Sequence, residues 1–288
     1  MENIIEKQVV HVNGNSIYFE SFRQHPSSKK TIILLHGFLS SSFSFRRLVP
    51  YLISEYNVIS IDLPPFGQSG KSRRYKYSYK NLAMTVIQLV EKMHLNKIIL
   101  LGHSMGGQIS LYIAHLRPDL IDKVVLLCSS AYLKKSKPHL VLASYLPFSH
   151  LFVKRWLERS GLENNLRLVV YNQSIIDEEM AEGYLAPFLK DDIFSALAKL
   201  IRDREGDLTA DIINKIQVPC LLLWGEQDRI VPLQTGKQLQ KDLNNSKLIV
   251  LKETGHLLPE ERPEEVYEYI REFIGEKQAA VDPGEYFS

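Results

Sequence analysis

The sequence has 288 residues and a mass of 33.1 kDa; 45% of its residues are hydrophobic and 24% are charged, which suits one large α/β domain with room for an inserted subdomain. Its 35 Lys and Arg residues nearly balance its 33 Asp and Glu residues, so the formal charge of +2 does not indicate a nucleic-acid partner. No run of about 18 uncharged apolar residues occurs, and residues 1–8 lack the apolar core of a secretory signal, so we expect a cytoplasmic protein without stable membrane insertion.

The first third of the chain predicts a hairpin followed by alternating strands and helices. Asn13-Gly14 lies between two β-prone runs, which is a strong hairpin signal. Later apolar runs are typical of central strands covered on both faces, and apolar residues recur at helical spacing after them. The predicted strands are residues 9–12, 16–22, 31–35 and 57–61, and the predicted helices lie within residues 43–54 and 77–94.

Basic and aromatic residues mix in residues 71–77, a pattern that could indicate nucleic-acid binding. No wider basic face accompanies this cluster. We therefore interpret it as a solvated loop.

A serine stands between the next predicted strand, residues 97–101, and a helix over residues 108–116. Such a strand-turn-helix context forces the Ser104 backbone into a strained geometry and projects its hydroxyl above the sheet. Gly102 and Gly106 flank it at two residues on either side and let strand and helix approach without a side-chain clash. A five-residue Gly-x-Ser-x-Gly match is weak alone, but its context here indicates a nucleophile.

The β/α alternation stops after a strand over residues 123–128 and resumes at the strand of residues 218–224. The patterns between them are helical, so we interpret residues 131–208 as a helical cap inserted into a core of residues 1–130 and 209–275, with 276–288 as a loose tail. A strand over residues 247–251 and a helix over 261–274 complete the core. Cys128 and Cys220 lie in or at the end of apolar runs, so we expect buried free thiols.

Polar motifs follow the predicted strands at the carboxyl edge of the sheet, where ligands bind in such folds. A serine hydroxyl needs a base to take its proton and a carboxylate to orient that base. Asp228 and His256 follow the last two strands, in the order expected after Ser104. Glu226 competes with Asp228 in the same loop, and Asp62 is interpreted as a loop-structuring residue.

The chain resembles the α/β-hydrolases, close to bacterial carboxylesterase-like members with a helical cap. The resemblance covers about residues 10–274 and rests on four motifs in order: His36-Gly37-Phe38, Gly102-His103-Ser104-Met105-Gly106-Gly107, Asp228 with Val231-Pro232, and Gly255-His256. It implies a mainly parallel eight-stranded sheet with an inserted helical cap. It also implies that Ser104 is the nucleophile, His256 the general base and Asp228 the orienting carboxylate. The backbone N–H groups of Phe38 and Met105 would form the oxyanion hole.

The substrate pocket is expected to include residues around the nucleophile and residues of the cap. We expect Gly37, Phe38, His103, Leu146 and Phe148 to contact substrate, and the imidazoles of His36 and His103 to support loops. The apolar residues of 138–153 would cover the site. A role at a membrane surface is the weaker alternative for that stretch, because Pro147 interrupts the helix and the basic face is small.

We therefore predict a serine hydrolase that cleaves a small or medium-chain apolar carboxylic ester through an acyl-enzyme, as a monomer or homodimer with a small-molecule substrate. No cofactor, metal or nucleotide is expected, since the chain has no His-Glu-x-x-His, Gly-x-Gly-x-x-Gly or P-loop motif. The serine nucleophile argues against epoxide or halide chemistry. A thioesterase, lactonase, perhydrolase or carbon–carbon bond hydrolase remain alternatives, as does a slow-turnover ligand-binding signalling protein.

Overall fold

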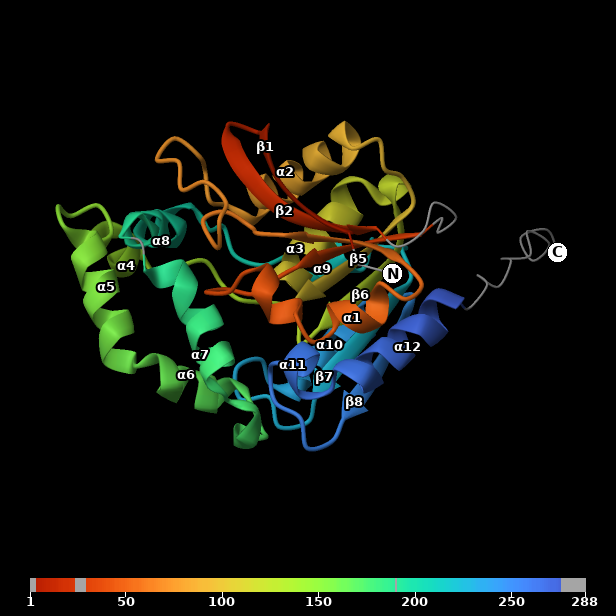
Figure 1. Ribbon diagram of the computed structural model, residues 1–288. Helices are drawn as coiled ribbons and strands as arrows, with labels where there is room; N and C mark the ends of the chain where they lie inside the picture. The colour runs from red at the N-terminus through yellow and green to blue at the C-terminus, as the bar shows by residue number, and fades with distance from the viewer. Residues whose placement is uncertain (1–3, 24–29, 190, 276–288) are drawn as a thin grey trace.

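In the computed structural model, which describes residues 4–23, 30–189 and 191–275, eight strands form one central sheet (Figure 1). The predicted loose tail, residues 276–288, lies outside the described residues. The strands are β1 (Ile4–Val12), β2 (Asn15–Arg23), β3 (Thr31–Leu35), β4 (Asn57–Ile61), β5 (Ile98–His103), β6 (Ile121–Leu127), β7 (Cys220–Gly225) and β8 (Ser246–Leu251).

The sheet order is β1-β2-β4-β3-β5-β6-β7-β8. Strand β2 runs antiparallel to both of its neighbours, and the strands from β4 to β8 are parallel to one another. The predicted hairpin is present, with Asn13 and Gly14 both at positive φ, as a two-residue turn of this type requires. The predicted eight-stranded, mainly parallel sheet is confirmed, and its parallel strands end at one common edge.

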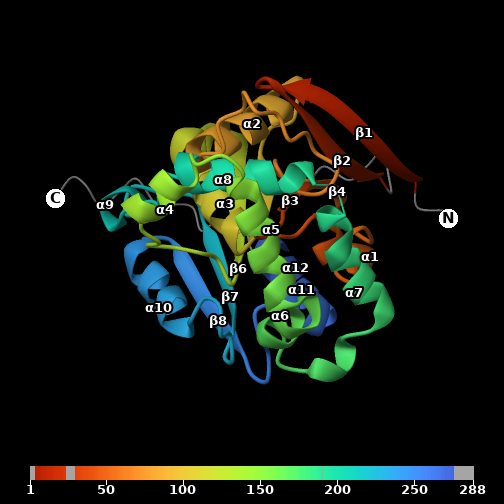
Figure 2. The same ribbon diagram turned by 90° about the vertical axis from the view of Figure 1, so that its left-hand side faces the viewer.

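Helices cover both faces of the sheet and bury its apolar strands (Figures 1 and 2). One group contains α2 (Tyr79–Lys92), α3 (Met105–Leu116), α9 (Ala210–Ile213) and α10 (Leu233–Asp242), and the other contains α1 (Val49–Leu52), α11 (Leu258–Glu261) and α12 (Pro263–Gly275). Both Cys128 and Cys220 are free and buried, as expected. Within the described residues, none of the helices combines the length and apolar character needed to cross a bilayer.

One predicted helix is shorter than its apolar pattern indicated: the stretch 43–54 contains only a 3₁₀ turn at Ser42–Phe45 and the short α1. The helix predicted over residues 261–274 is present as α12, and the short α11 precedes it. Proline limits where α1 and α12 begin, because it lacks an N–H and its ring clashes with the carbonyl four residues earlier. Pro50 and Pro263 each lie in the first turn of a helix, where proline is tolerated, so neither helix extends further back.

The helices α4 to α8, within residues 138–203 of the connection from β6 to β7, lie together at one end of the molecule (Figures 1 and 2); we call them the helical insertion. Its helices are α4 (Pro138–Ala143), α5 (Ser149–Ser160), α6 (Leu162–Val169), α7 (Glu178–Leu185) and α8 (Asp192–Asp203), with 3₁₀ turns at Gln173–Ile175 and Ala186–Phe188. Helix α5 packs against both α6 and α8.

Candidate active site

Ser104 occupies a sharp turn between the end of β5 and the start of α3. Its backbone angles, φ 51° and ψ −116°, lie outside the regions that residues with a side chain ordinarily adopt. The turn is held on both sides: the Ser104 N–H donates to the Leu127 carbonyl at 3.0 Å, and the Ser104 carbonyl accepts from the N–H groups of Gly107 and Ser130, each at 3.0 Å. The surrounding structure therefore maintains the strain, as it commonly does at functional sites.

Gly102 and Gly106 allow this turn because backbone atoms occupy the space of a side chain. A Cβ atom at position 106 would lie 2.0 Å from the Leu35 carbonyl oxygen, and one at position 102 would lie 2.4 Å from the Gly106 carbonyl oxygen. Both distances are far inside van der Waals contact. The predicted close approach of strand and helix is confirmed.

Replacing Gly106 by alanine should lower the free energy of unfolding by about 1–3 kcal/mol or more, because the rigid Leu35 backbone cannot move aside. Urea unfolding followed by circular dichroism measures this loss. The matched control is Gly275→Ala, where a Cβ would meet nothing within 4 Å. Equal stability of the two variants would contradict the packing argument.

Asp228 and His256 form a buried hydrogen-bonded pair at the carboxyl ends of β7 and β8. The His256 Nδ1–H donates to Asp228 Oδ2 at 2.7 Å. The other carboxylate oxygen, Oδ1, accepts from the N–H groups of Ile230 at 2.8 Å and Val231 at 2.9 Å. Burial by itself raises the pKa of Asp228, but the hydrogen bonds from His256 and the backbone outweigh it and hold that pKa below its usual range. The carboxylate thus stays charged and fixes the proton on Nδ1, which leaves Nε2 as an acceptor.

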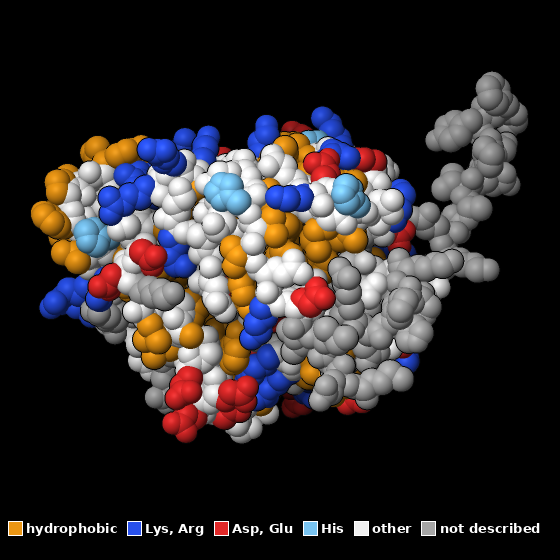
Figure 3. Space-filling model, turned by 45° about the horizontal axis from the view of Figure 1, so that its top comes forward, with side chains coloured by type: hydrophobic (Ala, Val, Ile, Leu, Met, Phe, Trp, Pro, Cys, Tyr) orange, Lys and Arg blue, Asp and Glu red, His pale blue; other side chains and the backbone are white. Residues whose placement is uncertain are grey.

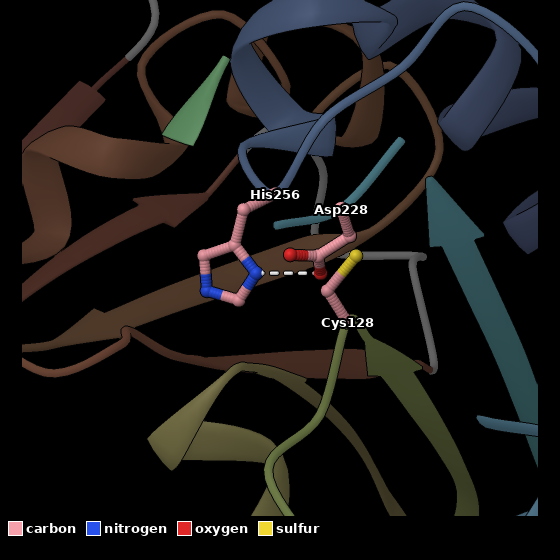
Figure 4. Close-up of side chains that lie close together, drawn as sticks. All are labelled: Cys128, Asp228 and His256. Atoms are coloured by element: carbon pink, nitrogen blue, oxygen red, sulfur yellow. Dashed lines mark hydrogen bonds and ion pairs between the residues drawn. The ribbon is translucent and has the colours of Figure 1, made fainter. Parts of the chain in front are cut away.

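Cys128 lies next to Asp228, and ligand-type atoms of Cys128, Asp228 and His256 lie within 4.8 Å of one another (Figure 4). The Gly225 N–H donates to the Cys128 sulfur at 3.5 Å, and the thiol donates to the Gly255 carbonyl at 3.9 Å. Burial raises the pKa of the Cys128 thiol well above its ordinary value, so it stays protonated and is a poor metal ligand. The trio therefore makes a poor metal site, because the protonated thiol bonds to the backbone of Gly225 and Gly255 and the carboxylate bonds to His256.

Two histidines support the site through the backbone. His103 Nε2–H donates to the His256 carbonyl at 2.9 Å, and the two rings lie 4.8 Å apart. His36 accepts from the Leu63 N–H at 2.8 Å through Nε2 and donates from Nδ1 to the Gly37 carbonyl, also at 2.8 Å. Burial lowers the pKa of His103 to about 3 and also lowers that of His36, so both rings remain neutral.

These neutral histidines should make the fold sensitive to acid. Because the unfolded chain binds a proton at His103 below about pH 6.5 and the folded chain does not until about pH 3, the free energy of unfolding should fall by about 1.4 kcal/mol per pH unit for this group as the pH drops through that window. Urea unfolding at about pH 7 and about pH 5 measures the slope. His103→Gln keeps an N–H donor and should show a shallower slope, whereas the exposed control His11→Gln should keep the wild-type slope. An unchanged slope in His103→Gln would contradict this assignment.

The helical insertion holds the His256 loop directly. The Val169 carbonyl at the end of α6 accepts from the N–H groups of His256 at 2.7 Å and Leu257 at 3.2 Å. The carboxylate of Glu261 accepts from the N–H groups of Tyr171 at 2.8 Å, Asn172 at 3.0 Å and Gly255 at 2.9 Å. Sequence reasoning missed Val169 and Glu261, because these contacts join distant segments through the backbone and leave no motif.

A pocket of about 710 Å³ lies between the helical insertion and the carboxyl edge of the sheet. Ser104 and His256 both line it, as do three of the predicted substrate contacts, Gly37, Phe38 and His103. Most of its remaining wall is apolar and includes Leu157, Leu166, Leu168, Val169, Leu185, Phe188, Leu189, Phe194, Ile230 and Leu257. Phe38 is held against the buried Phe66 of the Pro64-Pro65 loop, with ring centroids 5.6 Å apart.

The structure places the other two predicted substrate contacts, Leu146 and Phe148, outside this pocket, with 59% and 68% of their surfaces exposed. Pro147 lies between them, in the connection from α4 to α5, and α5 begins only after it. Helix α5 instead contributes Lys154 and Leu157 to the pocket. The structure therefore does not bring these two side chains into this pocket, because apolar character alone does not say which side of a helical segment faces the site.

The structure shows the roles of two further carboxylates near the site, Asp62 and Glu226. Asp62 accepts from the Ser42 and Gln68 N–H groups, each at 2.7 Å, so it structures its loop as predicted. Glu226 is exposed and accepts from the Gln227 side chain, whereas Asp228 contacts His256. The competition between the two acidic residues is thus decided in favour of Asp228 as the partner of the histidine.

Comparison with known proteins places this geometry in a family. The family model described as the alpha/beta hydrolase fold matches residues 30–263. The chain belongs to the α/β-hydrolase fold family. It is 51% identical over 263 residues to the uncharacterized hydrolase YugF of Bacillus subtilis, covering 91% of this chain and 96% of that protein. The predicted family and the hydrolase class are confirmed.

More distant similarities extend to one named lipase and one solved structure. Monoacylglycerol lipase abhd6-B of Xenopus laevis is 23% identical, covering 92% of this chain and 81% of that protein. A crystal structure of a membrane phospholipase A superposes with a TM-score of 0.78 at 23% identity, covering 94% of this chain and 86% of that one. The structural likeness supports the fold.

Proposed function

We propose that this hydrolase cleaves an apolar carboxylic ester through a triad of Ser104, His256 and Asp228. The observation that carries the proposal is that Ser104, in a strained turn, and His256, which is paired with the buried Asp228 at 2.7 Å, both line one largely apolar pocket. Strained backbone and paired titratable groups that meet in a cavity are typical of catalytic sites.

In the proposed reaction, His256 Nε2 takes the proton of the Ser104 hydroxyl while the oxygen attacks the ester carbonyl carbon. The tetrahedral intermediate collapses as His256 returns that proton to the leaving alcohol, and an acyl-enzyme remains. Water, activated by the same imidazole, then releases the acid and restores the serine. Asp228 stabilises the charged imidazolium in both halves of the cycle.

The backbone N–H groups of Phe38 and Met105 would stabilise the oxyanion. Met105 opens α3, where N–H groups lack helical partners and the helix dipole favours negative charge. Among the described residues, neither of these N–H groups donates to another protein atom. One such donor typically contributes about 2.7–4 kcal/mol to transition-state stabilisation.

Residues 131–208 act, in this proposal, as a cap that encloses the acyl or alcohol chain. The apolar pocket wall supports a small or medium-chain apolar substrate, and the monoacylglycerol lipase named among the relatives supports an ester. Glu261 and the Val169 carbonyl tie the cap to the His256 loop, so closing the pocket and positioning the base are coupled.

The test is fluorophosphonate labelling together with turnover of p-nitrophenyl esters of increasing acyl length. We expect stoichiometric labelling at Ser104 and a rate that peaks at short or medium chains. Parallel assays with thioester and lactone substrates separate the related chemistries on the same triad. Labelling with negligible turnover of every ester would replace the esterase proposal with a ligand-binding role.

A further inference from the structure

Large apolar side chains gather on the outside of the helical insertion. Those over residues 140–152 have between 49% and 75% of their surfaces exposed, although monomers rarely expose wide apolar patches. Figure 3 shows hydrophobic side chains along the left rim of the molecule, over the end that holds α4 and α5. We call this patch the α4–α5 surface; it consists of Leu140, Leu142, Tyr145, Leu146, Phe148, Leu151 and Phe152.

The segment that carries the α4–α5 surface is basic. Residues 129–157 contain five Lys or Arg residues and no Asp or Glu. Lys134, Lys135, Lys137 and Arg155 are exposed beside the patch, and Figure 3 shows Lys and Arg side chains along the same rim. On the neighbouring helix α8, Asp191 pairs with Lys154 at 2.7 Å, and Asp192 lies with Lys199 and Arg202 around a pocket that Tyr145 also lines.

Helix α5 connects this surface to the pocket. Its inner side contributes Lys154 and Leu157 to the pocket wall, while Leu151, Phe152 and Arg155 are exposed. Apolar side chains that flank a basic rim on one exposed face are the pattern of a helix lying in a membrane interface.

We propose that the α4–α5 surface docks on an anionic lipid bilayer. The apolar side chains would enter the acyl boundary, and Lys134, Lys135 and Lys137 would face the phosphate headgroups. Sequence reasoning weighed Pro147 against a membrane role, since it breaks a single amphipathic helix. In the folded chain Pro147 instead separates α4 from α5, and both helices and their connection expose apolar side chains together. The excess of basic side chains on this segment favours an anionic lipid surface over a second copy of the chain, because two such basic rims would repel.

The test is co-sedimentation of the full chain with phosphatidylcholine vesicles, with and without phosphatidylglycerol. The first variant reverses the rim charge with Lys134→Glu, Lys135→Glu and Lys137→Glu, and the second removes apolar surface with Leu142→Ser and Phe152→Ser. The matched control makes the same charge change at exposed positions outside the helical insertion, Lys237→Glu, Lys241→Glu and Lys252→Glu. Hydrolysis of a soluble ester and thermal unfolding confirm that every variant folds.

We expect binding that requires phosphatidylglycerol and weakens with added salt. Each basic residue near an anionic surface contributes about fivefold, so reversing three should weaken binding by about 100-fold or more, while the control binds like wild type. Loss of binding in the serine variant, by about tenfold or more, would show that apolar insertion contributes.

The proposal is overturned if the wild type fails to bind these vesicles, or if both patch variants still bind them like the wild type. If the wild type forms a dimer and does not bind vesicles, and the variant with Leu142→Ser and Phe152→Ser is a monomer, the surface is instead an interface with a second copy of the chain. Because vesicle binding does not require Ser104, the proposal and the esterase function succeed or fail separately.

Discussion

Replacing Ser104 by alanine should lower kcat for an ester by about 10⁶-fold, because the triad acts as a unit and His256 and Asp228 have no hydroxyl to activate once the nucleophile is gone. The fold should survive, since the backbone of Ser104 rather than its side chain makes the hydrogen bonds that hold the turn. Initial rates with a p-nitrophenyl ester and loss of fluorophosphonate labelling measure the effect.

Ser129→Ala is the control for this substitution. The Ser129 hydroxyl is also buried, but it donates only to the carbonyl of Ser130 and does not line the pocket. Its removal should change kcat by less than about threefold. If Ser104→Ala kept a rate within about tenfold of wild type, the nucleophile would have to be another residue.

Asp228→Asn should lower kcat by about 10⁴-fold through the tautomer of His256. The Oδ1 atom of Asp228 accepts from the Ile230 and Val231 N–H groups, so an asparagine would place its carbonyl oxygen there. Its NH₂ group would then face His256 Nδ1, at the position where Asp228 Oδ2 accepts the hydrogen bond from Nδ1–H in the wild type. The imidazole would have to carry its proton on Nε2, and it could no longer take the proton of the serine.

The control for this prediction is Glu226→Gln, which makes the same chemical change two residues away. Glu226 is exposed and does not contact the histidine, so its variant should keep wild-type kcat. Stability of Asp228→Asn by thermal unfolding separates a tautomer effect from misfolding. A near-normal rate in Asp228→Asn, or a large loss in Glu226→Gln, would assign the orienting role to a different carboxylate.

The sequence alone determined the sheet, the order of the polar motifs and the family. Short apolar runs identify strands because a strand buried on both faces tolerates little else, and Gly102, Ser104 and Gly106 identify a turn because only that spacing lets strand and helix pack. The carboxyl edge of a parallel sheet brings the motifs after successive strands together, so the positions of Asp228 and His256 in the chain already predicted their meeting. These features are local, or they follow from topology.

Only the tertiary structure decided which surfaces face the site. Leu146 and Phe148 read as pocket residues from their apolar character, yet they lie outside it, and the pocket wall comes from the other side of α5 and from α6 to α8. The contacts of Glu261 and Val169 with the His256 loop could not be predicted from the sequence either. They are made to backbone N–H groups or by a backbone carbonyl, and these groups are the same at almost every residue. Removing an apolar side chain from water is favourable in free energy wherever it is buried. The packing of helices that are distant in the sequence decides whether that side chain lies in the core, in the pocket or on the outer surface.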